Sequence, residues 1–297
     1  MNPTPLIINA AITGMVPTHK DNPHVPLSPA EIVADARRCR DAGASILHVH
    51  ARDDAGAPTC HREIFAEIIG GIRSACPGLL ISGTTSGRCH KEFEQRSQVL
   101  ELDGDLRPDF ASLTLGSMNF PTQASVNEPR MIQDLARRMR QRGIVPELEL
   151  FDLGMTDYAK YLVDRQILEP PFYANILLGS LGTLAATPQH LALMVDGLPE
   201  GTTWSAAGIG RYQWPMNQLA IAMGGHVRVG LEDNLWMDTA RTDPASNPRL
   251  VERLVKLAGQ MGRPIASPET ARDIIGLRPR TPHPESVSAS PPTPDSR

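Results

Sequence analysis

The chain has 297 residues, of which 41% are hydrophobic and 21% are charged, as expected for a packed globular protein. Its net charge of -4 and its aromatic content of 4% give no electrostatic or stacking basis for binding nucleic acid or an anionic membrane surface. No apolar run approaches the ~18 residues of a membrane span, and no basic signal segment begins the chain. The four cysteines form no CxxC pair. We therefore expect a cytoplasmic protein with free thiols.

Short apolar runs alternate with amphipathic segments along most of the chain. Apolar runs of about four to eight residues, bounded by turn residues, are typical of strands that are buried on both faces. The pattern predicts eight strands, at 5–12, 45–50, 79–84, 110–115, 145–151, 172–178, 203–207 and 226–229.

Helix signals fall between the predicted strands. Ser28, Pro29 and Glu31 form a capping box with proline at the first helical position, so a helix should run to about Asp41 and end at Gly43. Apolar residues also recur at helical spacing after residue 248. Comparable helices are predicted near 62–74, 90–101, 127–141, 156–166, 188–197 and 215–223.

Eight consecutive strand–helix units favour an α/β fold of the closed (β/α)8 TIM-barrel type over an open doubly wound sheet. A dinucleotide-binding fold would place GxGxxG after the first strand, but the turn at 13–17 has the sequence TGMVP. Residues 278–297 are rich in proline and serine and lack the apolar side chains that would offset the entropy cost of ordering. We therefore expect one barrel domain over 1–277 and a disordered tail over 278–297.

Functional groups of such barrels gather at the carboxyl ends of the strands. His48 and His50 stand two positions apart at the end of the second predicted strand, so both side chains should project into the barrel. Leu47 and Val49 should then face the helices. Two inward imidazoles suit a zinc ion, and a hydrogen-bonded pair of core histidines is the alternative.

A catalytic zinc ion usually takes three protein ligands, and the segment after the eighth strand offers Glu232 and Asp233. Either carboxylate could reach the barrel mouth, or it could serve as the acidic start of a helix. Arg228 is an inward charge on the same strand, for which Asp233 or a substrate carboxylate is the expected partner. His226 lies deeper and is expected to be structural.

Other polar groups stand near strand ends. Arg52 and Asp53 form either a loop salt bridge or a brace behind the histidines. The turn 208–211 brings the backbone of Gly210 to a region where barrels often bind phosphate, although a simple tight turn is the alternative. Further candidates at the ends of strands three to five are Thr84, Thr85, Ser112, Thr114, Glu147 and Glu149.

Seven segments together resemble the β-keto acid cleavage enzymes, and the combination of HVHARD with GGHVRVGLEDN is highly specific. The resemblance extends from Pro5 to about Leu277. The segments are AAITG (10–14), ILHVHARDDAG (46–56), PDFASLTLGSMNF (108–120), PELELFDLGM (146–155), AAGIGRYQ (206–213), GGHVRVGLEDN (224–234) and PIASPETARDIIGL (264–277).

The resemblance implies a (β/α)8 barrel, often assembled as a homotetramer, with Zn2+ held by His48, His50 and Glu232. It implies a reaction in which a β-keto acid and acetyl-CoA give acetoacetate and a new acyl-CoA. Asp233, paired with Arg228, matches the proton-handling pair of the family. Strand-end position and resemblance together give the expected substrate contacts, which are Thr84, Ser112, Thr114, Glu149 and Gly210.

One departure from the family pattern concerns the substrate. After AAITG, the amino-substrate enzyme of the family carries a glutamate that can pair with an ammonium group, whereas this chain has Val16. An ammonium group buried against valine would have no partner. Val16 therefore predicts a substrate side chain that is neutral or apolar rather than aminated, unless His19 or Lys20 turns towards the pocket and favours an anionic one.

Two other functions fit part of the pattern. A different zinc barrel, such as an amidohydrolase, usually has HxH after the first strand and further histidines on later strands, which strands five and six do not supply here. The other alternative is a non-catalytic barrel that binds a small molecule. The ionisable residues at the strand ends argue against it, because each is costly to bury without a purpose.

Overall fold

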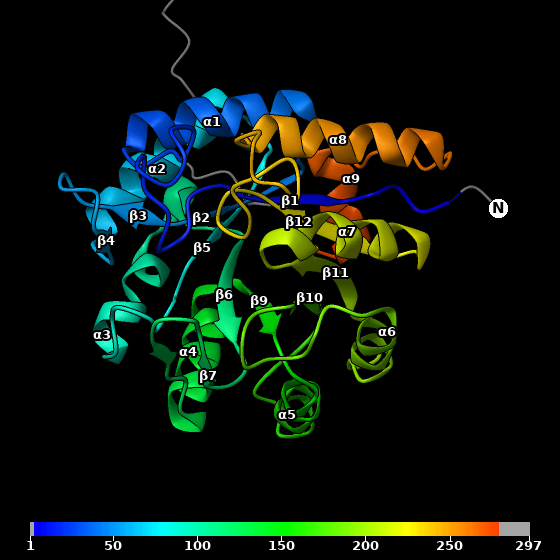
Figure 1. Ribbon diagram of the computed structural model, residues 1–297. Helices are drawn as coiled ribbons and strands as arrows, with labels where there is room; N and C mark the ends of the chain where they lie inside the picture. The colour runs from blue at the N-terminus through cyan, green and yellow to red at the C-terminus, as the bar shows by residue number, and fades with distance from the viewer. Residues whose placement is uncertain (1–2, 279–297) are drawn as a thin grey trace, which may run out of the picture.

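The computed structural model describes residues 3–278, and within this range eight parallel strands close into a barrel (Figure 1). Each strand pairs with the next one along the chain, and the last pairs with the first through Asn9 opposite Arg228. The predicted (β/α)8 barrel and all eight predicted strands are therefore confirmed. The strands are β1 (Ile8–Ala11), β2 (Ile46–Val49), β5 (Leu80–Gly83), β6 (Phe110–Thr114), β9 (Val145–Leu150), β10 (Tyr173–Leu178), β11 (Thr203–Gly208) and β12 (His226–Val229).

Helices between the strands form an outer ring, which Figure 1 shows around the barrel. The ends of the first helix follow the predicted chemistry, since the Ser28 hydroxyl accepts from the Glu31 N–H and Gly43 has a φ of 118°. Local capping thus decides where this helix begins and ends. The helices are α1 (Pro29–Ala42), α2 (Arg62–Ala75), α3 (Phe93–Arg96), α4 (Pro129–Arg142), α5 (Leu153–Asp164), α6 (Pro188–Asp196), α7 (Gln213–Ala222) and α8 (Asn247–Gln260).

The helix predicted over 90–101 is wrong in length. The structure has the single turn of α3, followed by a 3-10 turn over Gln98–Glu101. The buried Arg96 side chain donates to the Thr85 carbonyl at 2.8 Å and to the Asn127 side chain at 2.8 Å. These tertiary contacts hold the segment against the barrel, so local helical periodicity does not decide its conformation.

The amino end of the barrel is closed by α9 (Pro268–Ile275), a helix that the hydrophobic pattern had not indicated. Its Ala271 and Ile275 pack against a layer of large side chains inside the barrel. That layer is formed by Ile7, Ile46, Leu80, Phe110 and Tyr173. Because this end is filled by apolar groups, the polar side chains of the barrel interior gather towards the opposite, carboxyl end.

Two short hairpins build up the carboxyl end, and neither was predicted. One pairs β3 (Ala51–Arg52) with β4 (Pro58–Thr59), and the other pairs β7 (Met118–Asn119) with β8 (Ala124–Ser125). The buried Arg52 guanidinium donates to the carbonyl oxygens of three loop residues, Gly14, Pro17 and Gly56. Arg52 is therefore a brace that fixes the loop after β1, rather than half of a loop salt bridge.

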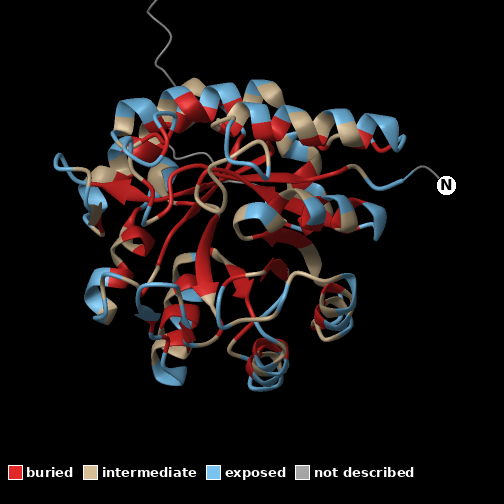
Figure 2. Ribbon diagram, viewed as in Figure 1, coloured by how far each residue is buried: buried red, intermediate tan, exposed pale blue. Residues whose placement is uncertain are grey.

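Burial follows this architecture, as Figure 2 shows with buried strands inside and exposed residues on the outer faces of the helices. No helix within residues 3–278 is long and apolar enough to cross a bilayer. All four cysteines are free thiols, so packing rather than cross-linking stabilises the described fold. The tail predicted over 278–297 lies, apart from Arg278, outside the described residues.

Candidate active site

His48 and His50 meet at the carboxyl end of β2. Their Nε2 atoms are 3.2 Å apart, and their side chains are only 1% and 3% exposed. Leu47 and Val49 pack instead in the hydrophobic layer between the barrel and its helices. The strand alternation read from the sequence therefore holds, and both imidazoles lie inside the barrel.

Glu232 joins this pair from the loop after β12. One of its carboxylate oxygens lies 3.3 Å from His50 Nε2, and the other lies 3.8 Å from His48 Nε2. Room for the carboxylate depends on Gly14, which has a φ of +72° and where an added Cβ would lie 2.8 Å from Glu232 Cγ. The glycine that ends the AAITG segment is thus required by the site itself.

The three side chains fit a divalent cation. His48, His50 and Glu232 each offer one ligand atom, and these atoms all lie within 4.8 Å of one another. Glu232 Oε2 is buried and has no hydrogen-bond partner within residues 3–278, a costly state that a bound cation would relieve. Two imidazoles and one carboxylate are also a donor set of catalytic zinc sites.

Glu147 of β9 orients His48 from deeper in the barrel. Its Oε2 lies 2.7 Å from His48 Nδ1 and also accepts from the Ser82 hydroxyl. Its Oε1 accepts from the side-chain amides of Asn9 and Asn175, each at 2.6 Å. A carboxylate on the far nitrogen of a metal-binding histidine fixes the ring and raises its basicity. Glu147 is therefore placed to aim His48 Nε2 at the cluster.

Arg228 of β12 is almost fully buried and holds three carboxylates. Its guanidinium donates to Glu149 at 3.1 Å, to Glu232 at 2.8 Å and to Asp233 at 3.0 Å. The pairing with Asp233 expected from the sequence is thus present. Because the guanidinium presents its N–H groups in a rigid fork, Arg228 sets the positions of these carboxylates relative to one another.

Burial and neighbouring charges shift the titration of these groups. Burial lowers the pKa of His48, but Glu147 and Glu232 outweigh it and raise that pKa to about 9, whereas burial dominates for His50 and lowers its pKa. Burial raises the pKa of Glu147, but His48 and Arg228 lower it to about 2, so Glu147 stays ionised. The pKa of Asp233 is raised by burial and by Glu232, against the opposing effect of Arg228.

His226 lies at the other end of β12. Its Nδ1 accepts from the backbone N–H of Ile7 at 3.0 Å. Burial, together with the nearby Arg263 guanidinium, lowers the pKa of His226 to about 3. The ring is therefore neutral and takes part in barrel structure, as expected from its depth.

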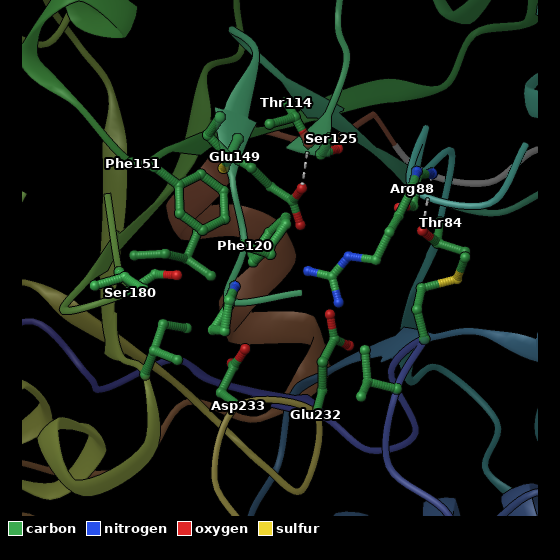
Figure 3. A pocket seen from close by; sticks show the side chains of 18 of the residues that line it. Thr84, Arg88, Thr114, Phe120, Ser125, Glu149, Phe151, Ser180, Glu232 and Asp233 are labelled. Carbon is green, nitrogen blue, oxygen red and sulfur yellow. Dashed lines mark hydrogen bonds between the residues drawn. The ribbon is translucent and has the colours of Figure 1, made fainter. Parts of the chain in front are cut away.

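A cavity of about 420 Å³ opens above the His48–Glu232 cluster, and Figure 3 shows side chains from several strand ends directed into it. Four of the expected substrate contacts line it, namely Val16, Thr84, Thr114 and Glu149. The Thr114 hydroxyl donates to Glu149 at 2.7 Å, and Val16 is 61% exposed at the mouth. The predicted contacts from four different loops and strands thus converge on one space.

Ser112 and Gly210 lie outside the lining of that cavity. Ser112 Oγ accepts from the Thr85 N–H at 3.0 Å, and the Ser112 carbonyl accepts from the Thr85 hydroxyl. Gly210 lines a neighbouring cavity and donates its N–H to the Asp233 carbonyl at 2.7 Å. In the structure, Ser112 supports the loop after β5, and Gly210 supports the loop that carries Asp233.

Two residues contribute to the site in ways that the sequence interpretation did not assign. Glu147 was among the strand-end candidates without a stated role, and it stands two positions before Glu149 and so shares its face of the strand. Arg88 gives no comparable signal. It lies in the loop after β5 and reaches the cavity with its guanidinium 3.5 Å from the centroid of the Phe120 ring, a contact that only the folding of the β7–β8 hairpin creates.

A family model described as beta-keto acid cleavage enzyme matches residues 5–277. The chain belongs to this family. It is 41% identical over 274 residues to a 3-keto-5-aminohexanoate cleavage enzyme of Fusobacterium nucleatum, covering 92% of this chain and 98% of that protein. It is 36% identical over 276 residues to a 3-oxoadipate:acetyl-CoA acetyltransferase of Cupriavidus necator, covering 92% and 95%. The resemblance stated from the sequence is confirmed for the β-keto acid cleavage enzyme family.

Among solved structures, the apo structure of ObcA matches the present chain with a TM-score of 0.77 at 20% sequence identity. The match covers 86% of this chain and 66% of the ObcA chain. At this identity the likeness concerns the fold, and it agrees with the closed parallel barrel described above.

Proposed function

We propose that the protein is a zinc-dependent acyltransferase that converts a β-keto acid and acetyl-CoA into acetoacetate and a new acyl-CoA. The observation that carries the proposal is the convergence of His48, His50 and Glu232 beside the Arg228–Asp233 pair, at the carboxyl end of the barrel. Active sites of TIM-barrel enzymes lie at this end. The name of the Cupriavidus relative gives both kinds of substrate, a β-keto acid (3-oxoadipate) and acetyl-CoA.

The residues that would hold zinc are His48, His50 and Glu232, with Glu147 fixing the His48 ring. When bound, the ion supplies a Lewis acid that polarises the keto oxygen and acidifies the neighbouring C2 protons. Asp233 lies beside this position and would accept a C2 proton. Arg228 holds Asp233 at 3.0 Å, so the carboxylate is restrained where the proton leaves.

The reaction balances without another reactant. After Asp233 takes the C2 proton, the C2 electron pair attacks the thioester carbon of acetyl-CoA, and coenzyme A leaves as its thiolate. The thiolate then attacks the original keto carbon, and the bond between C2 and C3 breaks. The C3 fragment departs as acyl-CoA. The C2 carbon, now carrying the acetyl group, regains a proton from Asp233 and leaves as acetoacetate.

Thr84, Thr114 and Glu149 are proposed as substrate contacts because they line the cavity. Ser112 and Gly210 remain predictions as contacts, and their observed bonds favour indirect support of the neighbouring loops. Val16 offers no partner to an ammonium group, so we propose a substrate that is not aminated. The neutral or apolar side chain expected from Val16 stays a prediction, as do the homotetramer, the cytoplasmic location and the single-domain boundary at 277.

An acetoacetate-release assay over a panel of β-keto acids with acetyl-CoA tests the proposed function. We expect release that depends on both substrates, and about one zinc ion per chain in protein purified without added metal. The variant His48→Ala should lose zinc and activity together, whereas His24→Ala, which changes an exposed histidine, should lose neither.

Activity unchanged in a metal-free protein would overturn the zinc site. Hydrolysis of amides or esters without coenzyme A would favour an amidohydrolase, and binding of acids without turnover would favour a non-catalytic barrel. Membership of the β-keto acid cleavage enzyme family counts against both of these alternatives.

A further inference from the structure

Arg88 holds an unpartnered guanidinium in the cavity above the His48–Glu232 cluster. Its Nε is buried without a hydrogen-bond partner, and no residue within 3–278 forms an ion pair or hydrogen bond with its side chain. The other cavity arginine, Arg228, is held by three carboxylates. An arginine that is partly removed from water and lacks a counter-ion is costly, so a partner from outside the chain is expected.

The position of this guanidinium is nevertheless well defined. It lies over the face of Phe120, 3.5 Å from the ring centroid, and Phe120 in turn meets Phe151 edge-on at 6.0 Å. Figure 3 shows the Arg88 side chain directed into the cavity. The aromatic shelf fixes the plane of the guanidinium and leaves its N–H groups free on the cavity side, an arrangement suited to a bidentate carboxylate.

The carboxylates around Arg88 do not pair with it. Burial lowers the pKa of Arg88, and Glu232, Glu149 and Asp233 oppose this effect, yet none of the three lies within ion-pair distance. A ligand carboxylate could therefore approach the guanidinium without displacing an existing protein partner.

The carboxylate that best fits Arg88 is one on the side chain of the substrate. In the proposed function, the keto oxygen of the β-keto acid would lie at the His48–His50–Glu232 cluster, and we place the C1 carboxylate beside it. The Arg88 guanidinium lines the same cavity, lies over the Phe120 ring and forms no ion pair with Glu232. Val16 lines the same cavity and contributes no charge that would compete with a second anion or attract an ammonium group.

We propose that Arg88 selects a β-keto acid whose side chain ends in a carboxylate, that is, a 3-oxo dicarboxylic acid. The inference rests on the proposed function and names its substrate class. It keeps the exclusion of an aminated side chain, because a guanidinium repels ammonium, and it replaces the neutral or apolar side chain expected from Val16 with an anionic one.

Two acids of equal chain length test the inference, 3-oxohexanoate and its dicarboxylic counterpart 3-oxohexanedioate. Each is supplied with acetyl-CoA, and kcat/KM is obtained from acetoacetate release for the wild type, Arg88→Met, Arg88→Lys and the control Arg130→Met. Arg130 is 92% exposed on α4, so its loss removes an arginine without touching the cavity. Binding of each acid without acetyl-CoA is measured in parallel by titration calorimetry.

We expect the wild type to prefer the dicarboxylic acid by at least about 10-fold, and Arg88→Met to lose about 10- to 100-fold on that acid alone. Arg88→Lys should fall between them, because it keeps the charge without the fork. Arg130→Met should match the wild type. Equal losses on both acids would overturn the inference, since Arg88 would then bind a group common to all β-keto acids.

A wild type that prefers the monocarboxylic acid would overturn the inference as well. If neither acid yields acetoacetate, the proposed function fails on its own terms. Calorimetry still decides the inference in that case. Preferential binding of the dicarboxylic acid that Arg88→Met abolishes would support it, and equal binding of the two acids would refute it.

Discussion

Replacing Glu147 with glutamine tests whether this buried carboxylate controls cation affinity at His48. Glutamine keeps the volume and one oxygen but turns the other oxygen into an NH2 donor. All four neighbours of Glu147 donate to it, two on each oxygen: His48 and Ser82 on one side, Asn9 and Asn175 on the other. Whichever way the new amide turns, its NH2 group faces two donors.

The expected effects are large for an isosteric change. Removing the partner of a metal-binding histidine lowers metal affinity about 10- to 100-fold. Breaking a fully buried ionic contact costs about 3–5 kcal/mol in the free energy of unfolding. Glu147→Gln should therefore bind zinc at least about 10-fold more weakly, and it should unfold at a clearly lower denaturant concentration than the wild type.

Competition with a chelator measures the zinc affinity, and circular dichroism with denaturant titration measures the stability. The matched control is Glu101→Gln, which removes a partly exposed ion pair with Arg138. Such a pair is worth at most about 1 kcal/mol, and it lies away from the site. The reasoning is refuted if folded Glu147→Gln holds zinc as tightly as the wild type does.

Three further predictions concern stability and the shape of the site. His226 has a pKa of about 3 in the fold, below its unfolded value of 6.5, so the unfolded chain takes up a proton first as the pH falls. The contribution of neutral His226 to the free energy of unfolding is thus fully present above pH 6.5, and acidification from pH 7 to 5 removes about 2 kcal/mol of it. In denaturant titrations, the free energy of unfolding of His226→Gln should therefore depend less on pH in this range. Gly14→Ala should lower the free energy of unfolding by about 1–2 kcal/mol and also weaken zinc binding, because its Cβ would meet Glu232. The control is Gly201→Ala, since Gly201 has a similar φ of +75° but open space around it. Equal losses of zinc affinity in both variants would contradict the steric argument. Arg228→Met should lower the free energy of unfolding by about 3–5 kcal/mol, since three carboxylates that are mostly removed from water lose their counter-ion. Arg249→Met on the surface should cost at most about 1 kcal/mol. Similar denaturation midpoints for the two variants would show that the cluster is not ionised as described.

Elements with a strong local signal were the ones that the sequence predicted well. The capping box at Ser28 and the αL glycine at Gly43 bound α1 in the structure as they do in the sequence. The buried strands were found because parallel strands covered on both faces are nearly continuous apolar runs. The segment 90–101 failed for the opposite reason, since contacts of Arg96 with distant backbone override its helical periodicity.

The candidate metal site was predictable from two short segments. Strand alternation placed His48 and His50 on one face, and the family resemblance singled out Glu232 of the GLEDN segment as their partner. The distances between them, and the support that Gly14 gives to Glu232, depend on closure of the barrel between β1 and β12. Contacts that join residues so far apart in the chain leave no periodic trace in the sequence.

The sequence by itself therefore determined the barrel class and the inward pair of histidines, because side-chain direction along a strand is a local property. It left Glu232 and Asp233 open as the third ligand, and only the family resemblance singled out Glu232. Tertiary structure alone decided which charges lack partners. It buried Glu147 under His48 and surrounded Arg228 with three carboxylates, and it laid Arg88 over Phe120 with no counter-ion from residues 3–278. Pairing is settled only when distant segments pack together, and the proposed choice of a dicarboxylic substrate rests on the Arg88 side chain that this packing leaves unpaired within that range.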